Sequence, residues 1–234
     1  ETEKELGVVC IDIGAGTTDI SIYSEGSVAY SAVLPIGARH ITNDLAIGLR
    51  ISLESAEKIK IFLSNTQKKP KIERLGETFE KDNKNTDEID LSSLGLPEDL
   101  RKVSSKTLTD GIIRPRLNEI FAMIGIEIKR SGFAGQTPAG IVVTGGGAQT
   151  VGITDSAKRT LAMPVRVGLP INIKGLIDEI ETPAFATVVG LAVFGASLDI
   201  KQSLPFGINF PSLGNLGFNR VLSRAINLIK SFMP

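Results

Sequence analysis

The segment that most restricts the fold lies near the start of the chain, where residues 9–19 read VCIDIGAGTTD. A run of mostly β-branched residues meets Asp12, and a loop of glycines and threonines follows. Alternating patterns on both sides predict three consecutive antiparallel strands, at residues 7–13, 19–23 and 27–34. A dinucleotide-binding unit of the Rossmann type needs a helix directly after its first loop, so this order excludes it.

The loop between the first two predicted strands has the chemistry of a phosphate site. Glycine lets backbone N–H groups approach phosphate oxygens closely, and the hydroxyls of Thr17 and Thr18 can add donors. Asp12, at the end of its strand, can hold Mg²⁺ through water or orient an attacking water. Asp19 is expected to hydrogen-bond the loop. The alternative is a simple glycine hairpin with a capping aspartate.

Two further segments suit a ligand when they are taken together with the loop. Residues 140–144 predict a buried strand that ends on TGGGA, where glycines would let a flat ligand lie against the backbone. Glu57, Lys60 and Ser64 have the spacing of one helical face and can bind a ribose and the edge of a base. The alternatives are a strand-to-helix turn and a solvated charged face.

The rest of the sequence predicts helices with a few short strands. Helices are predicted over residues 39–50, 52–64, 108–130, 154–162 and 183–197, and short strands near residues 70–74, 87–91 and 164–167. Ser52, with Ser55 as the second choice, and Thr182 are the expected N-caps. The long helix is expected to be interrupted around Arg114-Pro115. His40 fits a helix start, and Cys10 fits a small buried strand residue.

The total charge of the chain and the pattern of its last residues both indicate which partners it could bind. The chain of 234 residues has 26 basic and 26 acidic side chains, so its total charge predicts neither nucleic acid nor membrane as a partner. Residues 201–217 form a linker-like segment, and residues 218–233 carry one apolar helical stripe: Phe218, Val221, Leu222, Ala225, Ile226, Ile229, Phe232 and Met233.

The only charges in this last segment are basic: Arg220, Arg224 and Lys230. An apolar stripe with cations of one sign predicts a helix that lies on an anionic membrane surface. The alternative is a terminal helix docked on the core of the protein.

Several motifs in combination resemble one family. The strands around DIGAGTTD, the later TGGGA and the closing TPAFATVVGLAVFG resemble motifs of the actin-like ATPase superfamily. More closely, VLPIGARHITNDLAIGLRISLESAEKIK, PRLNEI, AGIVVTGGGAQTVGI and MPVRVGLPINIKGL resemble the FtsA family of bacterial cell-division proteins. The resemblance implies an α/β, actin-like fold with a ribonuclease-H-like core, represented by its second half only.

The same resemblance implies a division of the chain. Residues 1–39 and 108–200 would form subdomain 2A, and residues 40–107 an inserted α+β subdomain 2B, with a boundary possibly as late as residue 130. Residues 201–217 would be the linker, and residues 218–234 an amphipathic membrane-targeting helix.

The resemblance also implies ATP and Mg²⁺ as cofactors and gives roles to the motif residues. Asp12 would hold the metal through water and serve catalysis, and Glu57, Lys60 and Ser64 would meet the ribose and base. The phosphates and the adenosine would contact the two glycine-rich segments: Gly14, Ala15, Gly16, Thr17 and Thr18, and Gly145, Gly146 and Gly147. Hydrolysis would be slow at most, and with one wall of the cleft absent the isolated chain would bind ATP weakly or not at all.

The partners implied are the C-terminal peptide of the tubulin-like protein FtsZ, further copies in actin-like filaments, and the inner face of the cytoplasmic membrane at the septum. Arg116 and Glu119 fit the PRxxE pattern that helps to bind the FtsZ peptide; the alternative is an intrahelical ion pair between them. The rival readings are a PilM-like pilus-assembly protein, a DnaK-like chaperone and a sugar kinase.

Overall fold

The structure is a computed structural model that describes residues 1–68, 87–171 and 180–197. The strand predicted near residues 70–74, the linker and the basic amphipathic segment 218–233 lie outside the described residues. The described residues up to Val193 form one compact unit. Within the described ranges, no helix is both long and apolar enough to span a bilayer.

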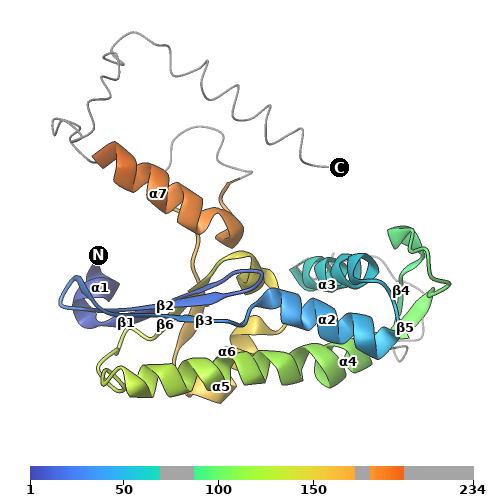
Figure 1. The fold of residues 1–234 in the computed structure, drawn as a ribbon, viewed down its shortest axis with the longest axis horizontal. Coiled ribbons are helices and arrows are strands. Elements are labelled where there is room, and N and C mark those ends of the chain that lie inside the picture. The colour runs from blue at the N-terminus through green and yellow to red at the C-terminus, as the bar shows by residue number, and fades with distance from the viewer. Residues whose placement is uncertain (69–86, 172–179, 198–234) are drawn as a thin grey trace, which may run out of the picture. The chain divides into compact units, whose positions relative to one another are not determined.

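This unit is built on a mixed five-stranded sheet in the order β3-β2-β1-β6-β7 (Figure 1). Its strands are β1 (Val8–Ile13), β2 (Thr18–Ser24), β3 (Ser27–Leu34), β6 (Ile141–Thr144) and β7 (Val165–Val167). β2 runs antiparallel to both of its neighbours, β1 and β3, whereas β6 and β7 run parallel to β1. These strands confirm the predicted ones, and the register places Asp12 between Asp19 and Thr144.

A tight hairpin joins β2 to β3 as the sequence predicts. Glu25 and Gly26 both adopt positive φ, 52° and 76°. Two successive residues of this kind match a two-residue turn whose twist agrees with that of the strands. The hairpin therefore fixes the pairing of the two strands locally.

Helices cover one face of the sheet. α5 (Arg114–Arg130) and α6 (Ile153–Leu161) run beneath it in Figure 1, and α2 (Ala38–Leu49) and α3 (Leu53–Lys68) extend beyond the ends of its strands. Val9, Ile11 and Ile13 of β1 are at most 1% exposed, because alternate residues of a strand point to the covered face. Cys10 points the other way and is half-buried, and burial raises the pKa of its thiol.

The long predicted helix is interrupted near the expected position. α4 (Ser105–Leu108) passes into a π-helical turn, η2 (Thr109–Ile113), before α5 begins. Pro115 lies in the first turn of α5, directly after the π-helical turn. The π-helical turn ends at Ile113, so the break comes directly before Arg114-Pro115, close to the predicted position.

The inserted region holds a small sheet of β4 (Glu88–Asp90) and β5 (Lys102–Ser104), with the 3₁₀ turn η1 (Ser92–Leu94) between them. β4 confirms the strand predicted near residues 87–91, whereas β5 was not predicted. A carboxylate ties this region to α3: Glu98 accepts hydrogen bonds from the N–H of Ser52 (2.8 Å) and the hydroxyl of Ser55 (2.6 Å). These bonds lower the pKa of Glu98 to about 2.

The remaining elements lie at the ends of the described chain and after β6. α1 (Thr2–Leu6), which the sequence pattern missed, precedes β1. η3 (Gly146–Gln149) follows β6, and η4 (Pro183–Phe185) leads into α7 (Ala186–Ser197). Ser52 caps α3 as predicted, since its hydroxyl accepts from the N–H of Ser55 at 3.2 Å. Thr182 occupies the expected N-cap position of η4, but its side chain makes no capping hydrogen bond.

Candidate functional site

The glycine-rich loop between β1 and β2 is closed on itself and packed against the start of α2. The N–H of Gly14 donates to the carbonyl of Thr17 at 2.9 Å. The N–H groups of Ala38 and Arg39 donate to the carbonyls of Gly14 (2.9 Å) and Ala15 (2.8 Å). Gly37 permits this approach, because a Cβ there would lie 2.7 Å from both carbonyl oxygens. The first turn of α2 therefore supports the loop.

The exposed tip of the loop carries Ala15, Gly16 and Thr17. Thr17 lies 3.5 Å from the Asp19 carboxylate, the long contact that joins Asp19 to the loop. Thr18 requires a correction. Its side chain is fully buried and its hydroxyl donates to the carbonyl of Ile36 at 2.7 Å, so this hydroxyl holds the loop in place and is not free to donate to a phosphate.

The three glycines of TGGGA occupy different surroundings. Gly145 has φ 83° and ψ 170°, and a Cβ there would lie 2.1 Å from Oδ1 of Asp12. A Cβ on Gly147 would lie 2.4 Å from Cγ2 of Ile13, whereas one on Gly146 would meet nothing within 4 Å. Gly145 and Gly147 therefore allow η3 to pack against the end of β1, and Gly146 is exposed to solvent.

Asp12 is held from a second element that the sequence analysis did not identify. The hydroxyl of Thr187 in α7 donates to Oδ2 of Asp12. The carbonyl of Pro183, just before α7, accepts from the N–H of Gly145 (3.0 Å) and from the hydroxyl of Thr144 (3.3 Å). The start of α7 is thus joined to both glycine-rich segments. A threonine in an apolar helix gives no sequence signal for such a contact.

The charged face of α3 forms a compact network with α2. Lys60 is buried, and its Nζ lies 2.7 Å from Oε2 of Glu57 and donates to Oγ1 of Thr42 at 2.9 Å. Thr42 in turn donates to Glu57 at 2.5 Å. The predicted sharing of one face by Glu57 and Lys60 is confirmed, and Thr42 is an added member that links the two helices.

Ser64 lies on the same face but has an internal role. Its hydroxyl donates to the carbonyl of Lys60 at 2.8 Å and accepts from the N–H of Val151 at 3.2 Å. The second bond joins α3 to the chain that follows TGGGA. Ser64 is buried, so its hydroxyl is engaged within the protein although its residue borders the pocket described next.

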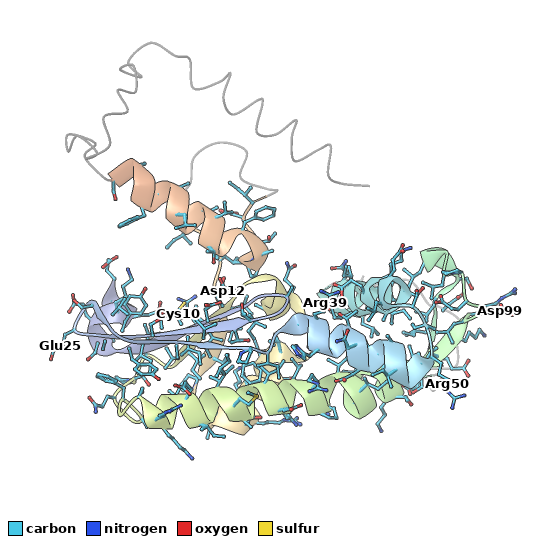
Figure 2. The ribbon with its side chains drawn as sticks, viewed as in Figure 1. Cys10, Asp12, Glu25, Arg39, Arg50 and Asp99 are labelled. Carbon is cyan, nitrogen blue, oxygen red and sulfur yellow. The ribbon has the colours of Figure 1, made fainter. Side chains whose placement is uncertain are left out.

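These segments meet around a pocket of about 670 Å³. Figure 2 marks two points of this region, Asp12 on β1 and Arg39 at the start of α2. Seven of the residues proposed from sequence line the pocket: Gly14, Ala15, Glu57, Lys60, Ser64, Gly146 and Gly147. Its volume lies within the range of small-molecule sites. Asp12, Gly16, Thr17, Thr18 and Gly145 do not line it.

Arg116 and Glu119 lie on α5, away from the pocket lining. The guanidinium of Arg116 binds Asp44 of α2 through two bonds, of 2.6 and 2.8 Å, and Glu119 through a third of 2.5 Å. The bonds to Asp44 are the main reason why the pKa of Arg116 is raised. The intrahelical pair with Glu119 is therefore present, and Asp44 is a partner that sequence spacing did not indicate.

The described part of the chain contains no cluster of three or more histidine, cysteine or acidic side chains that could hold a metal by itself. Magnesium is commonly bound by one or two carboxylates, with water and substrate phosphates completing its shell. A single half-buried Asp12 beside a glycine-rich loop fits that manner of binding.

Comparison with known sequences identifies one family. Residues 9–190 match the family described as Cell division protein FtsA. The chain is 40% identical to Cell division protein FtsA of Pseudomonas aeruginosa over 203 residues, which cover 87% of this chain and 45% of the relative. It is 33% identical to that of Escherichia coli, covering 83% of this chain and 45% of the relative. The chain thus spans about half the length of these relatives.

Solved structures with the same fold are actin-like proteins. MreB 5 of Spiroplasma citri bound to AMPPNP aligns with a TM-score of 0.57 at 22% identity, over 84% of this chain and 55% of that one. A PilM-PilN type IV pilus biogenesis complex aligns with a TM-score of 0.57 at 17% identity, over 84% of this chain and 48% of that one. These likenesses confirm the predicted actin-like α/β fold. The match over residues 9–190 and the identity to the relatives show that this chain belongs to the FtsA family of cell-division proteins.

Proposed function

We propose that this chain is the second half of an actin-like, ATP-binding membrane adaptor that polymerises and tethers FtsZ filaments to the cytoplasmic membrane at the septum. The observation that carries the proposal is the pocket in which the loop at Gly14 and Ala15, the glycines of TGGGA and the α3 face at Glu57 and Lys60 meet. The family match supplies the biological setting.

The residues of this chain would form one wall of an ATP site. Backbone N–H groups of the loop would face the phosphates, and Gly146 would let the nucleotide lie against the backbone. Asp12 would hold Mg²⁺ through water, and the metal would supply positive charge that neutralises the phosphates. Thr187 and Gly145 would keep the carboxylate of Asp12 in place. The opposite wall would come from the other half, so hydrolysis by this chain is not expected.

Nucleotide binding can be mapped on the chain by its amide NMR spectrum. ATP at millimolar concentration is expected to shift the amides of Gly14, Ala15, Gly146 and Gly147. Ala15→Glu should abolish these shifts, because it adds a carboxylate to the exposed loop. Ala29→Glu, on exposed β3 outside the pocket, is the matched control. Calorimetry that gave a micromolar affinity would contradict the half-site, and shifts confined to other surfaces would contradict the location.

The proposed FtsZ contact rests on α5 and α2. An acidic C-terminal peptide would have to compete with Asp44 and Glu119 for the guanidinium of Arg116, which suits carboxylates because of its planar fork. Arg116→Glu should weaken binding of the FtsZ peptide. Arg130→Glu, at an exposed position on the same helix, should not. Equal affinity of the two variants in fluorescence anisotropy would remove Arg116 from the interface.

Membrane attachment is proposed for residues 218–233 from their sequence alone. Phe218, Phe232 and the aliphatic residues between them would enter the acyl boundary, and Arg220, Arg224 and Lys230 would face anionic headgroups. Each cation near such a surface adds about 1 kcal/mol. Salt should therefore weaken the attachment, because it screens these charges.

A further inference from the structure

One basic residue of the pocket lining, Arg39, was given no role by the sequence motifs. Arg39 lies at the start of α2, and its backbone N–H donates to the carbonyl of Ala15 in the glycine-rich loop at 2.8 Å. Its side chain is exposed, and Figure 2 labels its position. Arg39 lines the pocket together with Gly14, Ala15, Gly146 and Gly147. The side chain of Arg39 therefore starts beside the wall that the phosphates would face.

The other charges of the pocket lining are already compensated. Lys60 is paired with Glu57 at 2.7 Å, and Glu54 is paired with Lys58 at 2.9 Å. The side chain of Arg39 forms no hydrogen bond or ion pair with any residue in the described ranges. Among the described residues that line the pocket, Arg39 is thus the one cation whose charge is not neutralised by a neighbour.

The loop itself needs such a charge. Asp12 and Asp19 flank it in sequence, and no basic residue lies between them, so the loop itself supplies no cation for a polyphosphate. A guanidinium presents several N–H donors in a plane that matches phosphate oxygens, and it remains charged at any physiological pH. Because the side chain of Arg39 has no partner to give up, it can turn toward a ligand in the pocket at little cost.

We propose that Arg39 contacts the phosphates of the bound nucleotide and makes the pocket select phosphorylated nucleotides over nucleosides. The inference rests on the proposed nucleotide function and adds a residue that determines specificity. Lys60, fixed by Glu57 and Thr42, would serve the sugar and base, whereas Arg39 would sense the number of phosphates. The contact is expected to strengthen from AMP to ATP, because the phosphate charge increases.

The test compares ATP, AMP and adenosine by NMR titration of the chain at constant ionic strength. Arg39→Gln should weaken ATP binding by about five- to tenfold, which lies within the range for the net loss of one hydrogen bond, and leave adenosine binding unchanged. Arg39→Lys should fall between the two, since it keeps the charge and loses the fork. Arg159→Gln is the matched control, because Arg159 is exposed on α6 outside the pocket lining.

The possible results distinguish the role of Arg39 from the proposed nucleotide function. An ATP preference that disappears in Arg39→Gln and persists in Arg159→Gln supports the inference. An unchanged ratio of ATP to adenosine affinity in Arg39→Gln overturns it, while the nucleotide function stands because ATP still binds. If neither ATP nor adenosine shifts the amides of the unmodified chain, the proposed nucleotide function fails, and the role of Arg39 fails with it.

Discussion

Replacing Gly145 by alanine should destabilise the protein far more than the same change at Gly146. Gly145 combines φ 83° with ψ 170°, a region that is almost restricted to glycine and costs other residues about 1–3 kcal/mol. The added Cβ would also lie 2.1 Å from Oδ1 of Asp12 and 2.6 Å from the carbonyl oxygen of Ile13. Forcing a methyl group into such a contact costs about 1–3 kcal/mol more.

The two costs together predict a loss of about 2–6 kcal/mol in the free energy of unfolding, a large part of the 5–15 kcal/mol typical of a domain. Gly146→Ala meets no atom within 4 Å, and its φ is not positive, so it should be neutral or stabilising by at most about 1 kcal/mol. Urea unfolding followed by circular dichroism measures both, with equal m-values as the check on two-state behaviour. A difference below about 1 kcal/mol would refute the packing of Gly145 against Asp12.

Two further stability predictions follow from the ion pairs. Lys60→Met should cost about 1–3 kcal/mol, because it leaves Glu57 and Thr42 without their buried cation, whereas Lys58→Met, which removes only an exposed pair, should cost under about 0.5 kcal/mol; equal urea midpoints for the two variants would contradict the network. The pKa of Glu98 is lowered to about 2, so the stability that this carboxylate contributes is present above its ordinary pKa of 4.5 and is lost as pH falls from there toward 2. Urea midpoints between pH 6 and pH 3 should therefore fall less in Glu98→Gln than in the unmodified protein, and identical pH dependence would exclude the bonds to Ser52 and Ser55.

The parts of the fold that depend on neighbouring residues could be predicted from the sequence. The hairpin at Glu25-Gly26 and the first strands follow from alternation and turn chemistry, which act over a few residues. The same holds for the shared face of Glu57 and Lys60, since helical periodicity alone brings them together. No comparable local pattern marks the π-helical turn at residues 109–113. The sequence predicted a break around the proline that follows it.

The site residues that were missed, or misread, depend on contacts between distant segments. Thr42 and Arg39 belong to α2, and they reach the pocket only because α2 packs against α3 and the glycine-rich loop. Thr187 contacts Asp12 across 175 positions of sequence. Thr18 was read as a phosphate donor because it follows the loop, yet strand alternation turns its side chain into the core. The division into subdomains 2A and 2B stays a prediction.

The adaptor function is tested most directly by co-sedimentation with anionic liposomes. The full chain should be compared with a chain that ends after Leu216, at low and at high salt. The proposal predicts that only the full chain pellets and that salt reduces the pelleted fraction, because Arg220, Arg224 and Lys230 act through screened charges. If neither chain pellets, the segment at residues 218–233 does not bind membrane, and the membrane-adaptor function proposed for this chain is contradicted.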